Sequence, residues 1–527
     1  MPRLNTFSAN TILATLVVMC PIACGIGTRE TDQDAVDSVS GGNVDPGQAV
    51  SAAELKQRLD TLKDGEPVTV TGTIATIHVA NFNWRTGEGV ASLNLLAPSP
   101  LEPQELGYLD IHCVFASADD LKGLVEEQSV VLTGVVDVDR RSRSLRGCRL
   151  VSRGDVPEYA PKAVDVDKVG ASEGETPAMP EGVGINRLEG FIEFEKAAVA
   201  EDGAVPQAAV DAVKDDQRFN AVVTQTPITN AALQQINAVS GLKELLLMEQ
   251  SGDESLDFSL LAEHPRLRHI EVHVDQFTND NLSQIGGLKC CAALVISGAS
   301  LFDGCDLSGT TDDGVRGLAR LKSLRFLTLE EKRKGEPSQI TDDGLTALGE
   351  LPRLTALDLW SESFNGAGLA ALSACPDLWS LRLSKCSVTA DGLASLKELS
   401  SLMVLNLSET EVDSTIGQTI SQLPNLTTLD LSKTKVDDEL AASLAGQPAL
   451  ASLNLRYNPA VTDKTLKTLA ENPPPHLRNL QLSGTQVTDE GVKLLTTVKT
   501  LRFLLTGNTS DAVKESLRQA NPELQIY

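Results

Sequence analysis

The stretch 340–359 combines two spacings of leucine. Three leucines three residues apart form one side of a short helix, and three more, ending in an alternating pair, form a strand with one buried face. These positions are Leu345, Leu348, Leu351, Leu354, Leu357 and Leu359. Thr341 is the expected N-cap of the helix, and Asp342 and Asp343 place negative charge at the positive end of its dipole. One unit of strand, turn and helix is too small to bury its own leucines.

The same unit recurs along the second half of the chain. The leading strand position returns every 24 residues at Leu354, Leu378, Leu402, Leu426 and Leu450, and other copies lead with Leu242, Leu267, Cys291, Leu324, Leu477 and Leu501. The signature Leu-x-x-Leu-x-Leu, which reads Leu378-x-x-Leu381-x-Leu383 in one copy, resembles the leucine-rich repeat family. The resemblance covers roughly residues 205–527. It implies an α/β solenoid with a parallel sheet on the concave side and helices on the convex side, and it implies no particular activity.

A different pattern precedes the repeats. Strand-like runs lie at 68–79, 90–95, 109–115, 130–138 and 145–151. A helical segment after Ser117 separates the third run from the fourth, which gives the order of an OB-fold. Gly72 and Gly134 suit the bends of such a barrel, and the region resembles the anticodon-binding type of OB-fold. We therefore predict a small all-β, OB-like barrel ahead of the solenoid.

The N-terminus has the pattern of an export signal. Arg3 provides a positive charge, and the apolar run 11–23 is about as long as the apolar core of a signal peptide. The run ends in Pro21-Ile22-Ala23-Cys24-Gly25, which resembles the bacterial lipobox, although Pro21 replaces the usual leucine. The resemblance implies lipidation of Cys24 and membrane anchoring in the cell envelope, on its periplasmic or surface side. Ordinary cleavage and an uncleaved anchor are the alternatives.

Composition divides the chain into five segments. The predicted layout is a signal peptide at 1–24, a flexible tether at 25–50, the OB-like domain at 51–153, a linker at 154–184 and the leucine-rich repeat domain with its caps at 185–527. The tether and the linker are rich in Gly, Ser, Pro and acidic residues, which is typical of flexible segments. Longer intervals between repeats predict two loops, near 300–305 and 331–336, on one rim of the solenoid.

The formal charge of −27 limits the classes of partner. Nonspecific attraction to nucleic acid or to anionic lipid requires a basic surface, so this charge argues against both. Acidic residues at helix starts explain part of it, because they complement the helix dipole. A basic partner is the second explanation.

Two cysteines fall on the third and fifth strands of the predicted barrel. Cys113 and Cys148 either pair after export or remain two buried thiols. Cys386 stands at a repeat position that the family uses for hydrogen bonds to the loop backbone of the next coil. Other copies carry Thr410, Thr434, Asn458 and Thr485 there.

Motifs for catalysis and for cofactor binding are missing from the sequence. It contains no His-Glu-x-x-His, no Gly-x-Ser-x-Gly and no phosphate-binding Gly-x-x-x-x-Gly-Lys motif. His269, Glu271 and His273 alternate along one strand, so they share the concave face. We interpret them as a polar stripe, because no fourth metal ligand is evident. The expectation is a protein with no metal, no cofactor and no enzymatic activity.

The concave face is the predicted binding surface. Residues between the leucines of each strand face outward and stack in columns from coil to coil. One column reads Thr328, Asp358, Arg382, Asn406, Asp430, Asn454 and Gln481, and the next reads Glu330, Trp360, Ser384, Ser408, Ser432, Arg456 and Ser483. A large aromatic side chain beside Arg382 resembles a hot spot, and packing of Trp360 against a neighbouring loop is the alternative. The predicted partner-binding residues are Asp358, Trp360, Arg382, Asn406, Asp430, Asn454, Arg456 and Gln481.

These patterns predict a non-catalytic exported lipoprotein that binds a protein or another macromolecule through its solenoid. One alternative is nucleic-acid or oligosaccharide binding by the OB-like domain, with Phe82 and Trp84 as stacking platforms and the solenoid as scaffold. The arginines that favour it are Arg140, Arg141, Arg143, Arg146, Arg149 and Arg153. A further alternative is similarity to the substrate-binding repeats of F-box ubiquitin-ligase adaptors, although no F-box precedes the repeats.

Overall fold

The structure is a computed structural model that describes two compact units, each of which is considered by itself. The described residues are 49–52, 55, 62–83, 88–95, 111–115, 121–126, 128–138, 143–158, 160–163, 179–186, 191–200, 203–216, 219–250, 255–298, 305–331, 338–361, 363–507 and 509–527. The predicted signal peptide with Cys24, nearly all of the tether and all but one residue of each predicted rim loop lie outside these residues. Among the helices that are described, none is long and apolar enough to cross a bilayer.

The larger unit contains one sheet in which every strand lies beside its sequence neighbours. In the described residues this sheet has 15 strands, and pairing is parallel from β8 through β21. Its strands are β7 (Val183–Asn186), β8 (Phe191–Phe194), β9 (Ala221–Thr224), β10 (Glu244–Gln250), β11 (His269–Val274), β12 (Ala293–Ser297), β13 (Phe326–Glu330), β14 (Ala356–Trp360), β15 (Ser380–Arg382), β16 (Val404–Asn406), β17 (Thr428–Asp430), β18 (Ser452–Asn454), β19 (Asn479–Gln481), β20 (Phe503–Leu505) and β21 (Gln525–Ile526).

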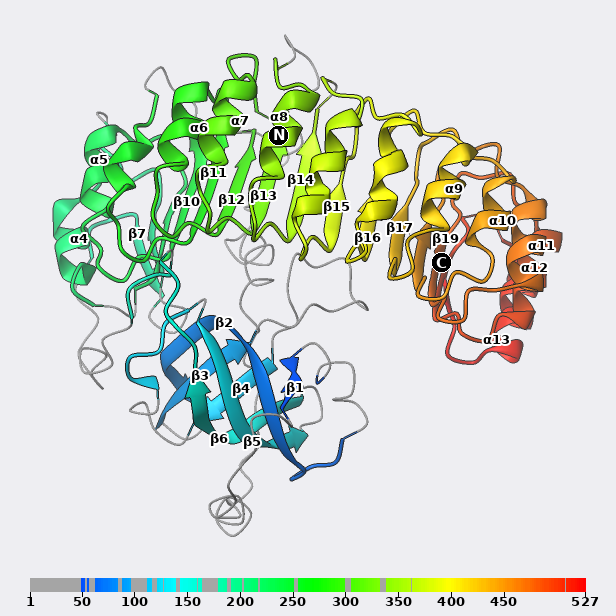
Figure 1. Cartoon of the computed structure of the whole chain (residues 1–527), viewed down its shortest axis with the longest axis horizontal. Helices are drawn as coiled ribbons and strands as arrows, with labels where there is room; N and C mark the ends of the chain where they lie inside the picture. Colours follow the sequence, from blue (N-terminus) through cyan, green and yellow to red (C-terminus); the bar gives the residue numbers. More distant parts are fainter. Residues whose placement is uncertain are drawn as a thin grey trace, which may run out of the picture. The chain divides into compact units, whose positions relative to one another are not determined.

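Short helices cover the opposite side of each coil. Figure 1 shows them along the outer side of this unit, with the strands along its inner side. The α-helices are α4 (Gln207–Val213), α5 (Asn230–Ile236), α6 (Asn279–Ile285), α7 (Asp312–Leu318), α8 (Asp342–Leu348), α9 (Gly417–Ile420), α10 (Leu440–Leu444), α11 (Asp463–Glu471), α12 (Asp489–Leu494) and α13 (Asp511–Ala520). The 3₁₀ helices are η5 (Phe258–Leu261), η6 (Ala367–Ala374), η7 (Gly392–Glu398), η8 (Ser414–Ile416) and η9 (Leu495–Thr497). The α/β solenoid predicted from the leucine spacing is confirmed.

Leucines of successive coils meet in the core of the solenoid. Strand register places Leu381 beside Leu405 and Leu405 beside Leu429, and all three side chains are fully buried. Burial of each such side chain contributes about 1.5–3 kcal/mol to the free energy of folding. The strand alternation that buries these leucines turns the intervening residues to the concave side.

The acidic first turns of the helices connect neighbouring coils. Thr341 is the N-cap of α8, as predicted, and its side chain accepts a hydrogen bond from the Asp343 amide at 3.2 Å. The backbone amide and hydroxyl of Thr341 also donate to Asp312 of the preceding coil, at 2.7 and 2.8 Å. Thr462 makes the same pair of bonds to Asp438, and Thr488 makes them to Asp463. Some of the acidic side chains therefore connect neighbouring coils through hydrogen bonds.

The column that contains Cys386 differs from the family pattern. The amide of Asn458 donates to the carbonyl oxygen of Leu431 in the preceding coil at 2.7 Å, and Cys386 Sγ lies 3.2 Å from the carbonyl oxygen of Leu359. Thr410 and Thr485 instead donate to carbonyl oxygens of their own coils. Thr434 does both, since its hydroxyl lies 2.8 Å from the carbonyl oxygen of Leu431 in its own coil and 3.2 Å from Asn458 Oδ1 in the next coil.

The smaller unit contains a sheet that closes on itself. Its strands are β1 (Val50–Ser51), β2 (Pro67–Asn83), β3 (Glu88–Leu95), β4 (Ile111–Phe115), β5 (Ser129–Val138) and β6 (Arg143–Arg153). Strand β2 pairs antiparallel with both β3 and β5, and the circuit continues through β4 and β6. Val70, Ile74, Leu93 and Leu132 fill its interior. Assignment of this sheet to the OB type stays a prediction.

Candidate functional site

The predicted concave columns are in register. Asp358 pairs with Arg382, Arg382 with Asn406, and Asn406 with Asp430 on successive strands. Asn454 and Gln481 continue the column. Parallel strands lie about 4.7–4.9 Å apart, so neighbouring members of the column stand side by side. The fold therefore brings together all the predicted residues of this column.

The central part of the concave surface is held by its own hydrogen bonds. Asn454 Nδ2 donates to Asp430 Oδ2 at 2.8 Å, and the backbone amide of Ser432 donates to Asp430 Oδ1 at 2.8 Å. In the second column the hydroxyl of Ser408 donates to that of Ser384 at 3.1 Å. These bonds fix the side chains and present an ordered polar surface.

Asp358 has an unusual electrostatic environment. Burial raises the pKa of its carboxyl to about 6; Arg382 opposes this shift and the negative charge of Glu330 adds to it. Its Oδ1 atom is buried and makes no hydrogen bond within the described residues. Glu330 itself accepts a hydrogen bond from the Ser297 hydroxyl at 2.6 Å. Arg382, a hydrogen bond with Trp360 and the charge of Lys385 stabilise the ionised carboxyl of Asp358, but together they do not offset its burial.

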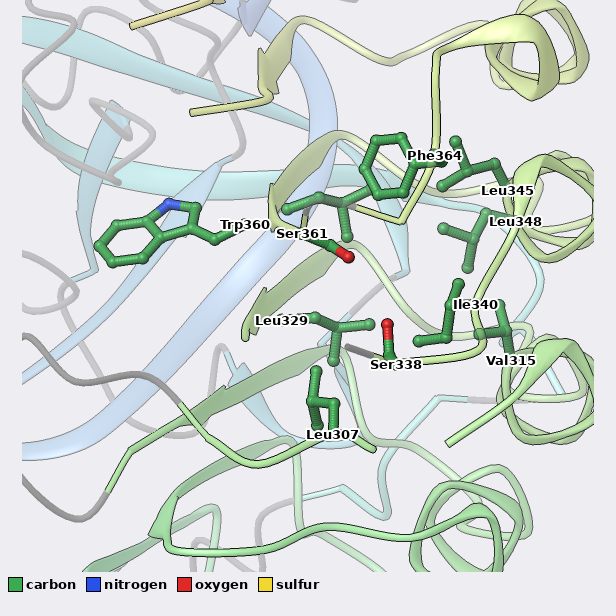
Figure 2. A pocket seen from close by; sticks show the side chains of 11 residues that line it. Leu307, Val315, Leu329, Ser338, Ile340, Leu345, Leu348, Trp360, Ser361 and Phe364 are labelled. Carbon is green, nitrogen blue, oxygen red and sulfur yellow. The ribbon is translucent and has the colours of Figure 1, made fainter. Parts of the chain in front are cut away.

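Trp360 lies on the concave side of β14. Figure 2 shows its ring pointing away from Leu345, Leu348 and Phe364, which surround a small apolar cavity of about 20 Å³. A cavity of this size holds no more than a single water-sized molecule, so it is not a ligand site. The Lys385 ammonium lies 3.6 Å from the centroid of the Trp360 ring. Trp360 is therefore a partly exposed cation–π partner on the predicted binding surface.

A row of left-handed residues lies beside this surface and is missing from the sequence prediction. Lys385, Glu409, Lys433 and Tyr457 have φ values of 62°, 59°, 53° and 58°. This conformation costs an L-residue about 1–2 kcal/mol relative to its favoured regions. The only signal for it in the sequence is glycine at the equivalent position of two later coils, Gly484 and Gly507.

The histidine stripe is a compact hydrogen-bonded group. His273 Nε2 lies 2.6 Å from Glu271 Oε1, and His269 Nε2 lies 4.0 Å from Glu271 Oε2. Burial would raise the pKa of Glu271, but the hydrogen bond with His273 and the charges of both histidines lower it overall. In the part of the chain that the structure describes, no group of three metal-ligating side chains is arranged to hold an ion.

The remaining predicted sites lie in the smaller unit. Cys113 and Cys148 are both buried and are not joined by a disulfide in this structure, and the choice between a bridge and two thiols stays a prediction. Arg149 and Arg153 are exposed on β6, and Arg146 is partly buried. Trp84, Arg140 and Arg141 lie outside the described residues, as do the side chains of Phe82 and Arg143.

Comparison with known proteins identifies the repeats. Residues 376–436 and residues 474–495 match two family models, both described as leucine-rich repeat. No curated protein matches the chain significantly. Similar solved structures include an internalin (InlF) from Listeria monocytogenes, with 15% identity, coverage of 64% of this chain and 86% of the other, and a TM-score of 0.43. Another is a TLR13–ssRNA13 complex, with 19% identity, coverage of 56% of this chain and 40% of the other, and a TM-score of 0.40.

The coils and the family matches define the class of the larger unit, which is a leucine-rich repeat solenoid. The two matched segments, 376–436 and 474–495, lie within this solenoid. Its central coils, led by Leu354 to Leu450, have a period of 24 residues and carry the polar concave columns described above.

Proposed function

We propose that this protein is a non-catalytic, exported lipoprotein that binds a macromolecular partner, most simply a protein, through the concave face of its solenoid. The observation that carries the proposal is the in-register surface of Asp358, Trp360 and Arg382 on adjacent strands. It combines an aromatic ring and a guanidinium group, which are side-chain types enriched at binding hot spots, with a carboxyl of raised pKa. Leucine-rich repeat domains generally mediate protein–protein interaction, in agreement with this role.

A pull-down from cell-envelope extract tests the proposal. Residues 25–527 would be compared with the double variant Trp360→Ala, Arg382→Glu, and we expect the partner to be lost by the variant. Lys467→Glu, on exposed α11, is the matched control because it changes a charge on the convex side. Equal capture by the wild type and the double variant would contradict concave-face binding.

Export and anchoring form a separate part of the proposal. The lipobox-like sequence supports diacylglycerol attachment at Cys24, which would place the solenoid in the cell envelope. Mass spectrometry of the N-terminal peptide is expected to detect a diacylglyceryl cysteine, and Cys24→Ser should release the protein from the membrane fraction. An unlipidated peptide from the wild-type protein would remove the anchor from the proposal.

The closed sheet of the smaller unit supports a second candidate, binding of nucleic acid or oligosaccharide. Exposed Arg149 and Arg153 on β6 are the specific observation in its favour. Labelled oligonucleotides should then bind the full chain with a steep salt dependence, and Arg149→Glu, Arg153→Glu should abolish the binding. Binding that is absent at low salt would exclude nucleic acid for this unit.

A further inference from the structure

The left-handed row consists of Lys385, Glu409, Lys433 and Tyr457. Stacking of the coils uses the backbone amides of these residues and does not require their side chains. The amides of Lys385, Glu409 and Lys433 donate to carbonyl oxygens of the following coil, each at 2.9 Å. A glycine adopts the left-handed conformation needed for this bond without the strain that a side chain adds. Gly484 and Gly507 occupy this position in later coils, with φ of 79° and 84°. The non-glycine side chains are therefore retained against a conformational penalty.

These side chains and their neighbours lie on successive coils. We define the cation–aromatic ribbon as Trp360, Lys385, Glu409, Lys433, Arg456 and Tyr457. Lys385 lies over the Trp360 ring, and Lys433 Nζ lies 3.3 Å from Glu409 Oε1 and 5.8 Å from the Tyr457 ring centroid. A guanidinium nitrogen of Arg456 donates to the Tyr457 hydroxyl at 3.1 Å. One group of contacts thus joins Trp360 and Lys385, and a second joins Glu409, Lys433, Arg456 and Tyr457.

The ribbon has the opposite charge from the chain as a whole. It carries three cations and one carboxylate in a protein of formal charge −27. Tyr457 is 48% exposed, so an aromatic surface remains available at one end of the ribbon. A cationic strip between aromatic platforms is complementary to an acidic partner. Glu409, in the middle of the strip, disfavours a continuous polyphosphate backbone, which places charge at every unit.

The spacing of the two lysines specifies the partner further. Lys385 and Lys433 belong to coils two strands apart, which corresponds to about 10 Å along the sheet. A polyproline-II peptide repeats every three residues and rises about 9 Å in that distance. Carboxylates three residues apart on such a peptide would therefore face the two lysines.

We propose that the cation–aromatic ribbon binds an extended acidic segment of a partner protein, with carboxylates at every third residue facing Lys385 and Lys433. This rests on concave-side partner binding by the solenoid and names the chemistry of the partner.

Fluorescence anisotropy with the full chain tests this proposal. The probe is a labelled nine-residue peptide of three Glu-Pro-Pro units, which favours the polyproline-II conformation. We expect it to bind at least about 10-fold more tightly than a peptide of the same composition with its three glutamates adjacent. A peptide of three Lys-Pro-Pro units should show no binding.

Glycine variants separate the side chains from the backbone. Lys385→Gly, Lys433→Gly should weaken binding of the Glu-Pro-Pro peptide by about 10-fold or more, with the melting temperature unchanged or raised. Glu409→Gln should strengthen binding, because it removes the carboxylate of the ribbon. Lys435→Ala is the matched control, since Lys435 is exposed in the same coil and pairs with Glu411 away from the ribbon.

Two results would overturn the ribbon proposal. One is equal peptide affinity for the wild type and the glycine double variant, and the other is tighter binding of an oligonucleotide or of heparin than of the acidic peptide. Either result leaves the envelope pull-down with Trp360→Ala, Arg382→Glu as the test of concave-face binding. The two experiments therefore distinguish a failure of the acidic-peptide proposal from a failure of concave-face binding.

Discussion

At the scale of single residues, Asp358 lies in the candidate site and its buried carboxylate destabilises the folded protein. Its pKa of about 6 lies above the ordinary value of 3.8, so the folded protein holds a proton that the unfolded chain releases between these pH values. Stability is therefore expected to fall as pH rises from about 4 to 6, and the cost remains above pH 6. An asparagine at position 358 would avoid this loss of stability, because its amide does not ionise.

Asp358→Asn should therefore stabilise the protein at pH 7.5, by roughly 1–3 kcal/mol. At pH 4.5 Asp358 is already mostly protonated in the folded state, so the difference from the wild type should be small. Denaturant unfolding at the two pH values measures the effect. A variant that is less stable than the wild type at pH 7.5 would show that the contact with Arg382 outweighs the burial of Asp358.

For Asp438 we expect the opposite dependence of stability on pH. Burial by itself would raise the pKa of its carboxyl, but hydrogen bonds from Thr462 and Thr465 lower it overall. Its stabilising contribution is present above the unfolded pKa and is lost as pH falls through the lower folded pKa. Asp438→Asn should cost about 1–3 kcal/mol at neutral pH, with a smaller difference near pH 3. The same unfolding series measures both aspartates, and an equal loss at both pH values would contradict the ionised role of Asp438.

At the scale of elements, glycine allows neighbouring convex helices to approach closely. A Cβ atom added at Gly368, in η6, would overlap the carbonyl oxygen of Asp342 in α8 and crowd Leu345. Neither helix is able to move away without disturbing the leucines beneath it. Close helix spacing and the curvature of the sheet are therefore linked through this position.

Gly368→Ala should destabilise the solenoid by about 1–3 kcal/mol, because overpacking shifts the backbone. Gly184→Ala is the control, since the nearest atom would lie 3.6 Å from the new Cβ. Thermal unfolding of both variants measures the contrast. Equal melting temperatures would mean that the η6 segment relaxes freely.

The solenoid was predictable from the sequence because its signal is local and repeated. Leucine spacing identifies each strand, and one register then orders the concave columns that contain Asp358 and Arg382. The raised pKa of Asp358 was not predictable, since its main cause is burial of the carboxyl in the folded structure, with a further contribution from Glu330 of a different coil. The 3₁₀ form of η6 and η7 also escaped prediction, because it depends on the room left between neighbouring convex segments.

The left-handed row shows a different limit of sequence reasoning. Lysine, glutamate and tyrosine carry no local preference for positive φ, so Lys385, Glu409 and Tyr457 look like ordinary surface residues. Their conformation is imposed by stacking of the coils, which only the three-dimensional structure displays. In the smaller unit, the closed circuit of β2 to β6 depends on pairings between distant strands, which the order of strand-like runs suggested but did not establish.

At the scale of the whole molecule, each coil of the solenoid makes its main contacts with the coils on either side. Leu429→Ala, in the middle of the array, should cost about 2–5 kcal/mol through the cavity that it leaves. Hydrogen exchange should rise in β16, β17 and β18, while β9 to β11 keep their protection, because stability is a sum over nearest neighbours. Leu245→Ala should raise hydrogen exchange in β9 to β11 and leave β16 to β18 protected. Uniform loss of protection by either variant would indicate a single cooperative unit.

The consecutive order of strands in the sheet also has a mechanical consequence. A solenoid pulled from its two ends would lose coils one after another, because each strand described in this sheet pairs only with its neighbours in sequence. Each 24-residue coil would release about 80 Å of contour length. The intervals of 33 residues from Cys291 to Leu324 and 30 residues from Leu324 to Leu354 would release about 110 and 100 Å. The size of each extension step would therefore identify which part of the solenoid has opened under load.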